Sequence, residues 1–136
     1  MSFTLFTQKK LLDHLNGGTA FTQPSTLTLA LFKTNPGEAG TAGTEVSAST
    51  DDTAYARQTI TFAAATLATG IALSSNAQTF AAVVYGSGAA AYTVTHIGIY
   101  SNTGDMVSYT ALGASISRVV GKTLAFDTGA VTVALD

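Results

Sequence analysis

The chain has 136 residues, no cysteine, 10% charged residues and a formal net charge of -2 at pH 7. That length suits a single domain spanning residues 1–136, and the lack of cysteine excludes disulfides, thiolate metal sites and thiol catalysis. The weak negative charge gives no basic field for nucleic acid or anionic lipid, and no apolar stretch approaches the roughly 20 residues that cross a bilayer. We therefore expect neither a nucleic acid nor a membrane as partner.

The first predicted element is a short helix over residues 8–15. Three leucines recur there at helical spacing, and an Asn-Gly-Gly sequence at residues 16–18 is a stop signal. A helix of about two turns is not stable alone and must dock on something. Before it, Phe3, Leu5 and Phe6 form an apolar tip. Residues 1–7 either pack on their own domain or form an N-terminal arm that reaches a neighbouring chain.

Everything after residue 18 indicates strands and turns. Residues 26–32 alternate leucine with threonine or alanine, which is the period of a half-buried strand. Further strands are predicted at 56–62 and 78–85, and two hairpins around the Asn-Thr-Gly-Asp and Asp-Thr-Gly turns. The first hairpin pairs 92–100 with 106–112, and the second pairs 123–126 with 130–135.

The number and spacing of these strands predict the fold class. Seven or eight short strands separated by regular turn signals indicate an all-β protein, namely a β-sandwich of jelly-roll type with one short N-terminal helix. No crossover helices are available, so an all-parallel sheet is excluded. Residues 38–53, rich in Gly, Ala, Ser and Thr, carry four acids outside any apolar pattern. They are expected to form a long exposed loop.

The residues needed for catalysis or metal binding are nearly absent. His96 has no carboxylate within eight positions on either side, and a strand histidine bonded to a neighbour explains it better than a catalytic triad does. Asp51 and Asp52 lack the alternating ligand spacing of a calcium loop, so a turn or a solvent-exposed role is predicted for them instead. The sequence therefore predicts no enzyme, no metal site and no cofactor.

Interface residues are the better candidates for function. Tyrosine offers a large contact area with a polar tip, which suits protein interfaces, although these rings could equally close the ends of the sandwich. Arg57 and Arg118 are isolated cations, so each is expected to have a carboxylate partner within or between chains. Together with the apolar tip and the acidic loop, the candidate interface residues are Phe3, Leu5, Phe6, Glu38, Glu45, Tyr55, Arg57, Tyr92 and Arg118.

The middle of the chain is uncharged. Residues 58–104 contain no Asp, Glu, Lys or Arg, and their polar groups are mainly Thr and Ser interleaved with Ala and Gly. A surface of short side chains loses little rotamer entropy when another protein covers it. This favours a surface that binds a protein, the alternative being a neutral solvent face without a partner.

The order of segments resembles a family of small tailed-phage virion proteins, described as tail-fibre or head-decoration proteins. The resemblance covers most of the chain and is carried by short segments: KLLDHLNGGT at 10–19, LTLALF at 27–32, NPGEAG at 35–40, EV at 45–46, YARQ at 55–58, VTHIGIY at 94–100 and GKTLAF at 121–126.

The resemblance implies a structural virion protein without catalytic residues. It implies a jelly-roll cement subunit on the outer capsid surface, assembled in the host cytoplasm, that bridges major capsid proteins and forms a dimer or another small oligomer. Linkage to the assembled lattice and avidity would then stabilise the shell. One alternative is a tail-fibre or baseplate component that works in host attachment and binds surface sugar through tyrosines. Another is a carbohydrate-processing enzyme, which would need two suitably spaced carboxylates.

Overall fold

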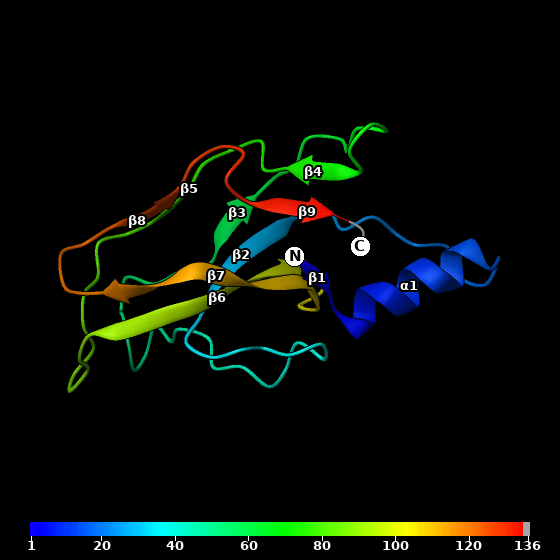
Figure 1. The fold of residues 1–136 in the computed structure, drawn as a ribbon. Coiled ribbons are helices and arrows are strands. Elements are labelled where there is room, and N and C mark those ends of the chain that lie inside the picture. The colour runs from blue at the N-terminus through cyan, green and yellow to red at the C-terminus, as the bar shows by residue number, and fades with distance from the viewer. Residues whose placement is uncertain (135–136) are drawn as a thin grey trace.

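The protein, described for residues 1–134 by a computed structural model, consists of antiparallel strands and one helix (Figure 1). This confirms the all-β class and the N-terminal helix. In chain order the elements are β1 (Ser2–Phe3), α1 (Leu5–Leu15), β2 (Leu27–Phe32), β3 (Gln58–Ile60), β4 (Ile71–Leu73), β5 (Gln78–Phe80), β6 (Tyr92–Ser101), β7 (Met106–Arg118), β8 (Leu124–Phe126) and β9 (Thr132–Ala134).

The centre of the fold is a five-stranded antiparallel sheet with the strand order β1-β7-β6-β2-β3. Its longest strands, β6 and β7, form the first predicted hairpin, which is confirmed and extends to Arg118. In the turn, Gly104 has a φ of 88°, and the Ser101 N–H donates to the Asp105 carbonyl at 2.9 Å. Glycine takes this left-handed conformation without steric cost. The Asn-Thr-Gly-Asp sequence was therefore sufficient to predict the turn.

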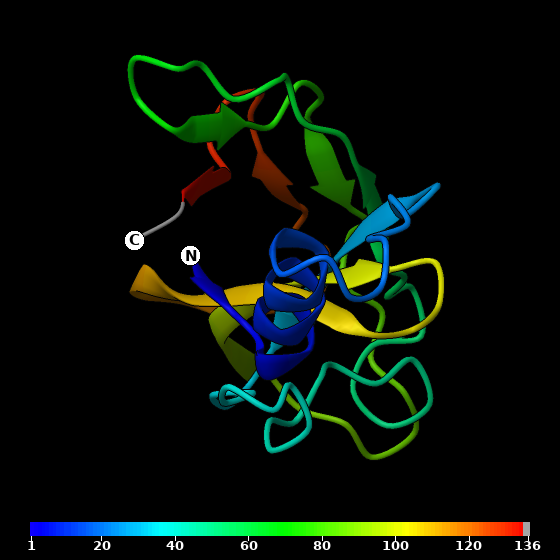
Figure 2. The same cartoon turned by 90° about the vertical axis from the view of Figure 1, so that its right-hand side faces the viewer.

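Two small sheets, β4-β9 and β5-β8, lie over one face of the central sheet (Figures 1 and 2). The main hydrophobic core lies between the two layers and consists of Leu29, Leu31, Val46, Ile60, Phe80, Val83, Tyr92, Val94, Ile97, Ile99 and Val131. The described strands do not form the two four-stranded sheets of a jelly roll. The layered β arrangement is therefore confirmed, while the jelly-roll topology is not.

The second predicted hairpin is wrong. β8 pairs with β5 and β9 pairs with β4, so the turn at residues 127–129 joins strands of different sheets. The buried Ser74 holds this turn, because its carbonyl and its hydroxyl both accept from the Gly129 N–H, at 2.8 and 3.0 Å. The sequence correctly predicted a turn, but packing in the hydrophobic core determines which strands pair with each other. Residue 135 of the predicted strand lies outside the described residues.

β2 is buried on both faces, although its alternation predicted a half-buried strand. Leu29 and Leu31 belong to the main core, while Ala30 and Phe32 pack with Met106 in a second cluster on the opposite face. The loop after β2 covers that second face, and the backbone of Gly40 lies against the Met106 side chain. The second face carries threonine and small residues, which are also typical of a face exposed to solvent, so its burial could not be predicted from the sequence.

Residues 38–53 are a covering layer fixed to the sheet at several points, with exposed side chains between them. The Val46 N–H donates to the Leu31 carbonyl at 2.9 Å, and the Lys33 N–H donates to the Thr44 carbonyl at 2.8 Å. Val46 and Asp52 are buried, and the positions between them are partly or fully exposed. Of the two roles predicted for Asp51 and Asp52, the turn is confirmed, because both backbone N–H groups donate to the Ser47 carbonyl, whereas Asp52 is buried and not solvent-exposed.

The helix begins at Leu5, three residues before its predicted start. β1 adds to the edge of β7, and Thr4 and Thr7 donate side-chain hydrogen bonds to the carbonyls of Met106 and Val107. Residues 1–7 thus pack on their own domain, which was one of the two alternatives. The last turns of α1 extend beyond the end of the sheet (Figures 1 and 2).

The covering layer can be tested with a glycine pair. A Cβ at Gly43 would lie 2.6 Å from Pro36 Cα and 2.9 Å from the Thr34 carbonyl oxygen, whereas a Cβ at Gly113 would meet open space. We expect Gly43→Ala to lower the free energy of unfolding by about 1–3 kcal/mol, because backbone atoms must shift. Gly113→Ala should be neutral or slightly stabilising. Urea denaturation measures both, and equal stabilities would contradict an ordered covering layer.

Candidate functional site

The nine predicted interface residues lie in three places. The first group lies at the end of β2 and consists of Glu45, Tyr55 and Arg57. The second group lies next to residues 81–84 and consists of Tyr92 and Arg118. The other four, Phe3, Leu5, Phe6 and Glu38, surround the start of α1. The first two groups are internal networks, whereas the third borders an open apolar surface.

The first network is built on a bidentate ion pair. Arg57 Nε and Nη2 donate to Glu45 Oε1 and Oε2 at 2.8 and 2.7 Å, and the Tyr55 hydroxyl donates to Glu45 Oε1 at 2.8 Å. The Tyr55 oxygen in turn accepts from the Leu31 N–H at 3.1 Å. The hydrogen bond to Glu45 raises the pKa of Arg57, so this cation stays charged. The Arg57 guanidinium lies 3.7 Å from the ring centroid of Tyr100.

The second network is buried. Asp52 and Arg118 are 1% and 2% exposed, and Arg118 Nη2 lies 3.9 Å from Asp52 Oδ2. Tyr92 donates its hydroxyl to the same Oδ2 at 2.9 Å, while Asp52 Oδ1 accepts from the backbone N–H groups of Val84 and Ala54, both at 3.0 Å. The prediction that Arg57 and Arg118 have carboxylate partners is therefore confirmed within the chain.

The guanidinium of Arg118 also forms hydrogen bonds that connect β7 to other segments. Its Nη1 donates to the Lys122 carbonyl at 3.0 Å and its Nη2 to the Ala81 carbonyl at 2.9 Å. Sequence reasoning selected Tyr92 and Arg118 but missed Asp52, because the surrounding Ser and Thr residues are typical of an exposed loop. The signal that could have found it is the isolated buried cation, which requires a buried anion.

Both networks connect segments of the fold, and their acidic groups already have partners within the chain. The carboxylates of Glu45 and Asp52 are each engaged by an arginine and a tyrosine. Among residues 1–134 no three His, Asp or Glu side chains gather closely enough to hold a metal ion. His96 Nδ1 lies 2.8 Å from the hydroxyl of its neighbour Thr95. The one helix described here, α1, is too short to span a membrane.

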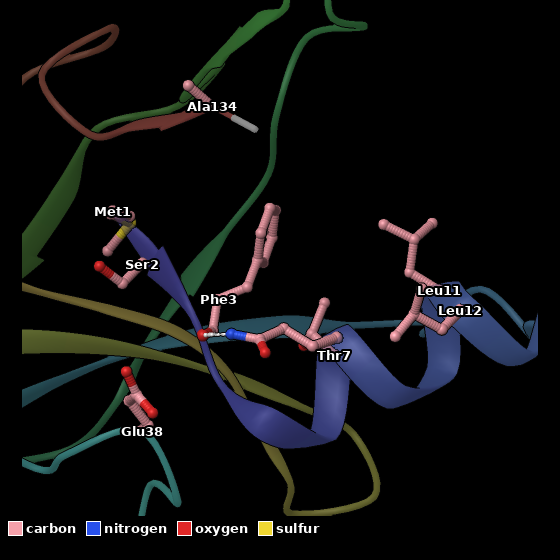
Figure 3. Close-up of a pocket in the computed structure, with 9 residues that line it drawn as sticks. Met1, Ser2, Phe3, Thr7, Leu11, Leu12, Glu38 and Ala134 are labelled. Atoms are coloured by element: carbon pink, nitrogen blue, oxygen red, sulfur yellow. Dashed lines mark hydrogen bonds between the residues drawn. The ribbon is translucent and has the colours of Figure 1, made fainter. Parts of the chain in front are cut away.

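The third group borders a groove beside α1, shown in Figure 3. This N-terminal groove has a volume of about 450 Å³, and its walls come from β1, α1, the loop after β2 and the end of β9. The Leu5 N–H donates to the Glu38 carbonyl at 2.9 Å, which fixes the helix start against the covering layer. The lining residues are Met1, Ser2, Phe3, Thr7, Gln8, Leu11, Leu12, Glu38 and Ala134.

A row of exposed leucines follows one side of the same helix. Leu5, Leu12 and Leu15 are 52%, 57% and 70% exposed, and we call them the leucine stripe. Phe6 is half-buried on another side, where Lys10 Nζ lies 5.9 Å from its ring centroid. Exposed apolar residues that gather on one element mark contact surfaces more often than scattered ones do. The sequence pointed to Leu5, but assigned the later leucines to packing.

A second apolar surface lies on the segment between β3 and β4. Leu67 is fully exposed near its tip, and Ile71 and Leu73 are 37% and 47% exposed along β4. No charged residue occurs anywhere in residues 58–104. Sequence analysis singled out the uncharged stretch as a possible binding surface but predicted no strand at residues 71–73 and named none of these three residues.

Comparison with protein families decides the class of this chain. Residues 2–134 match the family described as Podophage GP4 fiber I protein gp80. The chain belongs to this family. A comparison with curated proteins finds no match. Membership of the fiber I protein family confirms the predicted resemblance to small tailed-phage virion proteins, and it makes the chain a structural protein of the bacteriophage virion.

The buried ion pair predicts a large effect for one carboxylate. Asp52→Ala should lower the free energy of unfolding by about 3–5 kcal/mol, because it leaves the Arg118 charge buried without a partner. Asp127→Ala is the matched control, since Asp127 lies on an exposed turn, and it should change stability by less than about 0.5 kcal/mol. Chemical denaturation followed by circular dichroism measures both. A small effect of Asp52→Ala would show that this network contributes little to the stability of the fold.

The same network predicts an alkaline transition. Burial raises the pKa of Tyr92 to about 12, helped by its hydrogen bond to Asp52. A phenol with a raised folded pKa contributes stability that is complete below its unfolded value of 10.0 and is lost as the pH rises from there towards 12. The stability difference between the natural protein and Tyr92→Phe should therefore shrink above pH 10. A pH-independent difference in melting temperature would contradict this.

Proposed function

We propose that the chain is a non-catalytic building subunit of a virion fibre, and that it works by binding other virion subunits. The family match over residues 2–134 carries this proposal, because the family is described as a fiber I protein. The fibre reading was the alternative in the sequence analysis, and the name of the family now favours it over capsid decoration.

The distribution of polar groups supports an assembly role. Glu45, Asp52, Arg57 and Arg118 are all used in contacts within the chain. The apolar features that remain available at the surface are the leucine stripe, the N-terminal groove and the segment around Leu67. Such surfaces suit protein contacts that stay formed, because their burial is favourable without any matched charge.

The aromatic residues support assembly more than sugar binding. A sugar ring stacks on an open aromatic face, but the Tyr100 ring lies under Arg57 and beside Phe32, whose centroid is 6.3 Å away. Tyr55 stacks on Phe80 at 6.0 Å. These rings already have partners within the chain, so we assign host-glycan recognition to other components of the virion.

A second candidate is decoration of the capsid, with the major capsid protein as partner and the outer capsid surface as location. The observation that favours it is the uncharged stretch at residues 58–104, whose short side chains lose little entropy on binding a lattice. Stabilisation of the lattice would then follow from binding assembled capsomers only. Neither candidate requires a catalytic group.

Separation of virions into heads and tails tests the two candidates. We expect mass spectrometry to find this chain in the tail fraction, and cryo-electron microscopy of intact particles to show its five-stranded sheet in a fibre. The major capsid protein serves as the marker for the head fraction. Recovery of the chain with heads, in regular lattice positions, would replace the fibre proposal by capsid decoration. Absence from purified virions would contradict both.

A further inference from the structure

The leucine stripe has the spacing of a helix-pairing seam. Leu5 and Leu12 are seven residues apart, Leu15 follows three residues later, and Gln8 occupies the remaining position of this pattern. Positions that repeat by three and four residues lie on one side of a helix and meet a second helix in coiled-coil packing. Thr7 and Leu11 lie on the neighbouring side, towards the protein's own β-strands. The seam is therefore separate from the surface by which α1 docks on its own domain.

The polar groups next to the seam are already satisfied. The Gln8 side-chain amide donates to the Phe3 carbonyl at 3.0 Å, so its polar end is bound and its methylene groups remain on the seam. Lys9 forms an ion pair with Asp13 one turn further along the helix. Lys10 lies on another side, against Phe6. A second helix of the same kind would therefore meet no unpaired charge from Lys9 or Asp13 beside this seam.

We propose that the leucine stripe binds the leucine stripe of a second copy of this chain, so that α1 forms the contact between subunits. The proposal rests on the proposed function as an assembled virion subunit and names the surface that the assembly uses. Charge favours a like partner over an oppositely charged one, because the Lys9 charge is neutralised within the helix. An identical helix also presents the same spacing, which makes the seam self-complementary.

An antiparallel arrangement fits the side chains of the seam. It would set Leu5 of one copy beside Leu15 of the other, and Leu12 beside Gln8, so that no leucine faces open solvent. Antiparallel helices also align their dipoles favourably. Leu12 lines the N-terminal groove as well as the seam, so the contact would continue into an existing apolar hollow.

The area available is compatible with a specific contact. Each leucine of the stripe is more than half exposed, and burying three on each of two copies removes several hundred Å² from water. A specific interface needs roughly 1,000 Å² in total, which the groove walls and the methylene groups of Gln8 help to supply. The second half of α1 extends beyond the sheet (Figure 1), and its Leu12 and Leu15 are 57% and 70% exposed, so this part of the seam is accessible to another copy.

The oligomeric state of the purified protein tests this inference. The natural chain at about 50 μM should show a mass of at least two copies in size-exclusion chromatography with light scattering, since interfaces of this small size bind in the micromolar range. The double variant Leu12→Gln and Leu15→Gln should be monomeric, because glutamine keeps helix propensity but removes the apolar seam. Val120→Gln is the matched control, since Val120 is 58% exposed, like Leu12, and lies outside the stripe and the other apolar surfaces; it should keep the natural mass.

The outcomes separate clearly. A monomeric natural chain, or a double variant that still assembles, would overturn the proposal. Circular dichroism and melting temperature must stay near those of the natural protein in the double variant, because these leucines are exposed in the single subunit. Should the double variant fail to fold, the cross-linking experiment below decides.

A cross-link gives the second measurement, because the chain has no cysteine of its own. A single Leu12→Cys variant, treated at about 50 μM with a short bifunctional thiol cross-linker, should form covalent dimers in high yield. Val120→Cys, at an equally exposed position outside the stripe, should not. Equal yields from both variants would overturn the proposal. A chain that is monomeric by both tests but present in virions would leave the proposed function intact and remove only this interface.

Discussion

The contact between Arg118 and Asp52 is the constraint on which the rest of the fold depends. It brings the end of β7, the covering layer and residues 81–84 to one buried point, with Tyr92 from β6 as the fourth member. A buried charge without a partner is strongly unfavourable, so none of these segments can move independently. The chain has no disulfide, and this polar junction takes the corresponding role between the layers.

Pairing of charges within the chain also determines the character of the surface. Four ion pairs among residues 1–134 engage four of the six cations and four of the eight acids. Burial would raise the pKa of Asp51, but hydrogen bonds from Lys33 and from the Ser47 N–H lower it, so this acid also stays ionised in its pair. What the protein offers to its surroundings is therefore nearly neutral, with apolar features on α1 and on the β3–β4 segment. For a virion subunit, recognition then depends on shape and apolar contact more than on charge.

Local features of the fold could be predicted from the sequence, whereas the arrangement of the strands in sheets could not. The β6–β7 hairpin could be predicted because its turn chemistry and its pairing lie within one segment. The pairing of β8 with β5 could not, because two short strands of three residues carry no signal that selects a partner far along the chain. Among the site residues, Arg57 and Arg118 were found because isolated cations need partners, whereas Asp52 was missed because its neighbours resemble an exposed loop. The leucine stripe was missed because helix periodicity alone does not reveal which side faces the protein.

The edge position of β1 has a consequence for biosynthesis. Ser2 and Phe3 pair with Tyr109 and Ser108, and Thr4 bonds to Met106, so β1 is held by residues that are synthesised more than a hundred positions later. The nascent helix has no surface to dock on until β7 has left the ribosome, and long-range contacts of this kind form slowly. A short helix is unstable alone, so α1 takes its final position late. We therefore expect the leucines of an unfinished chain to be held on a rigid helix only after the central sheet is complete.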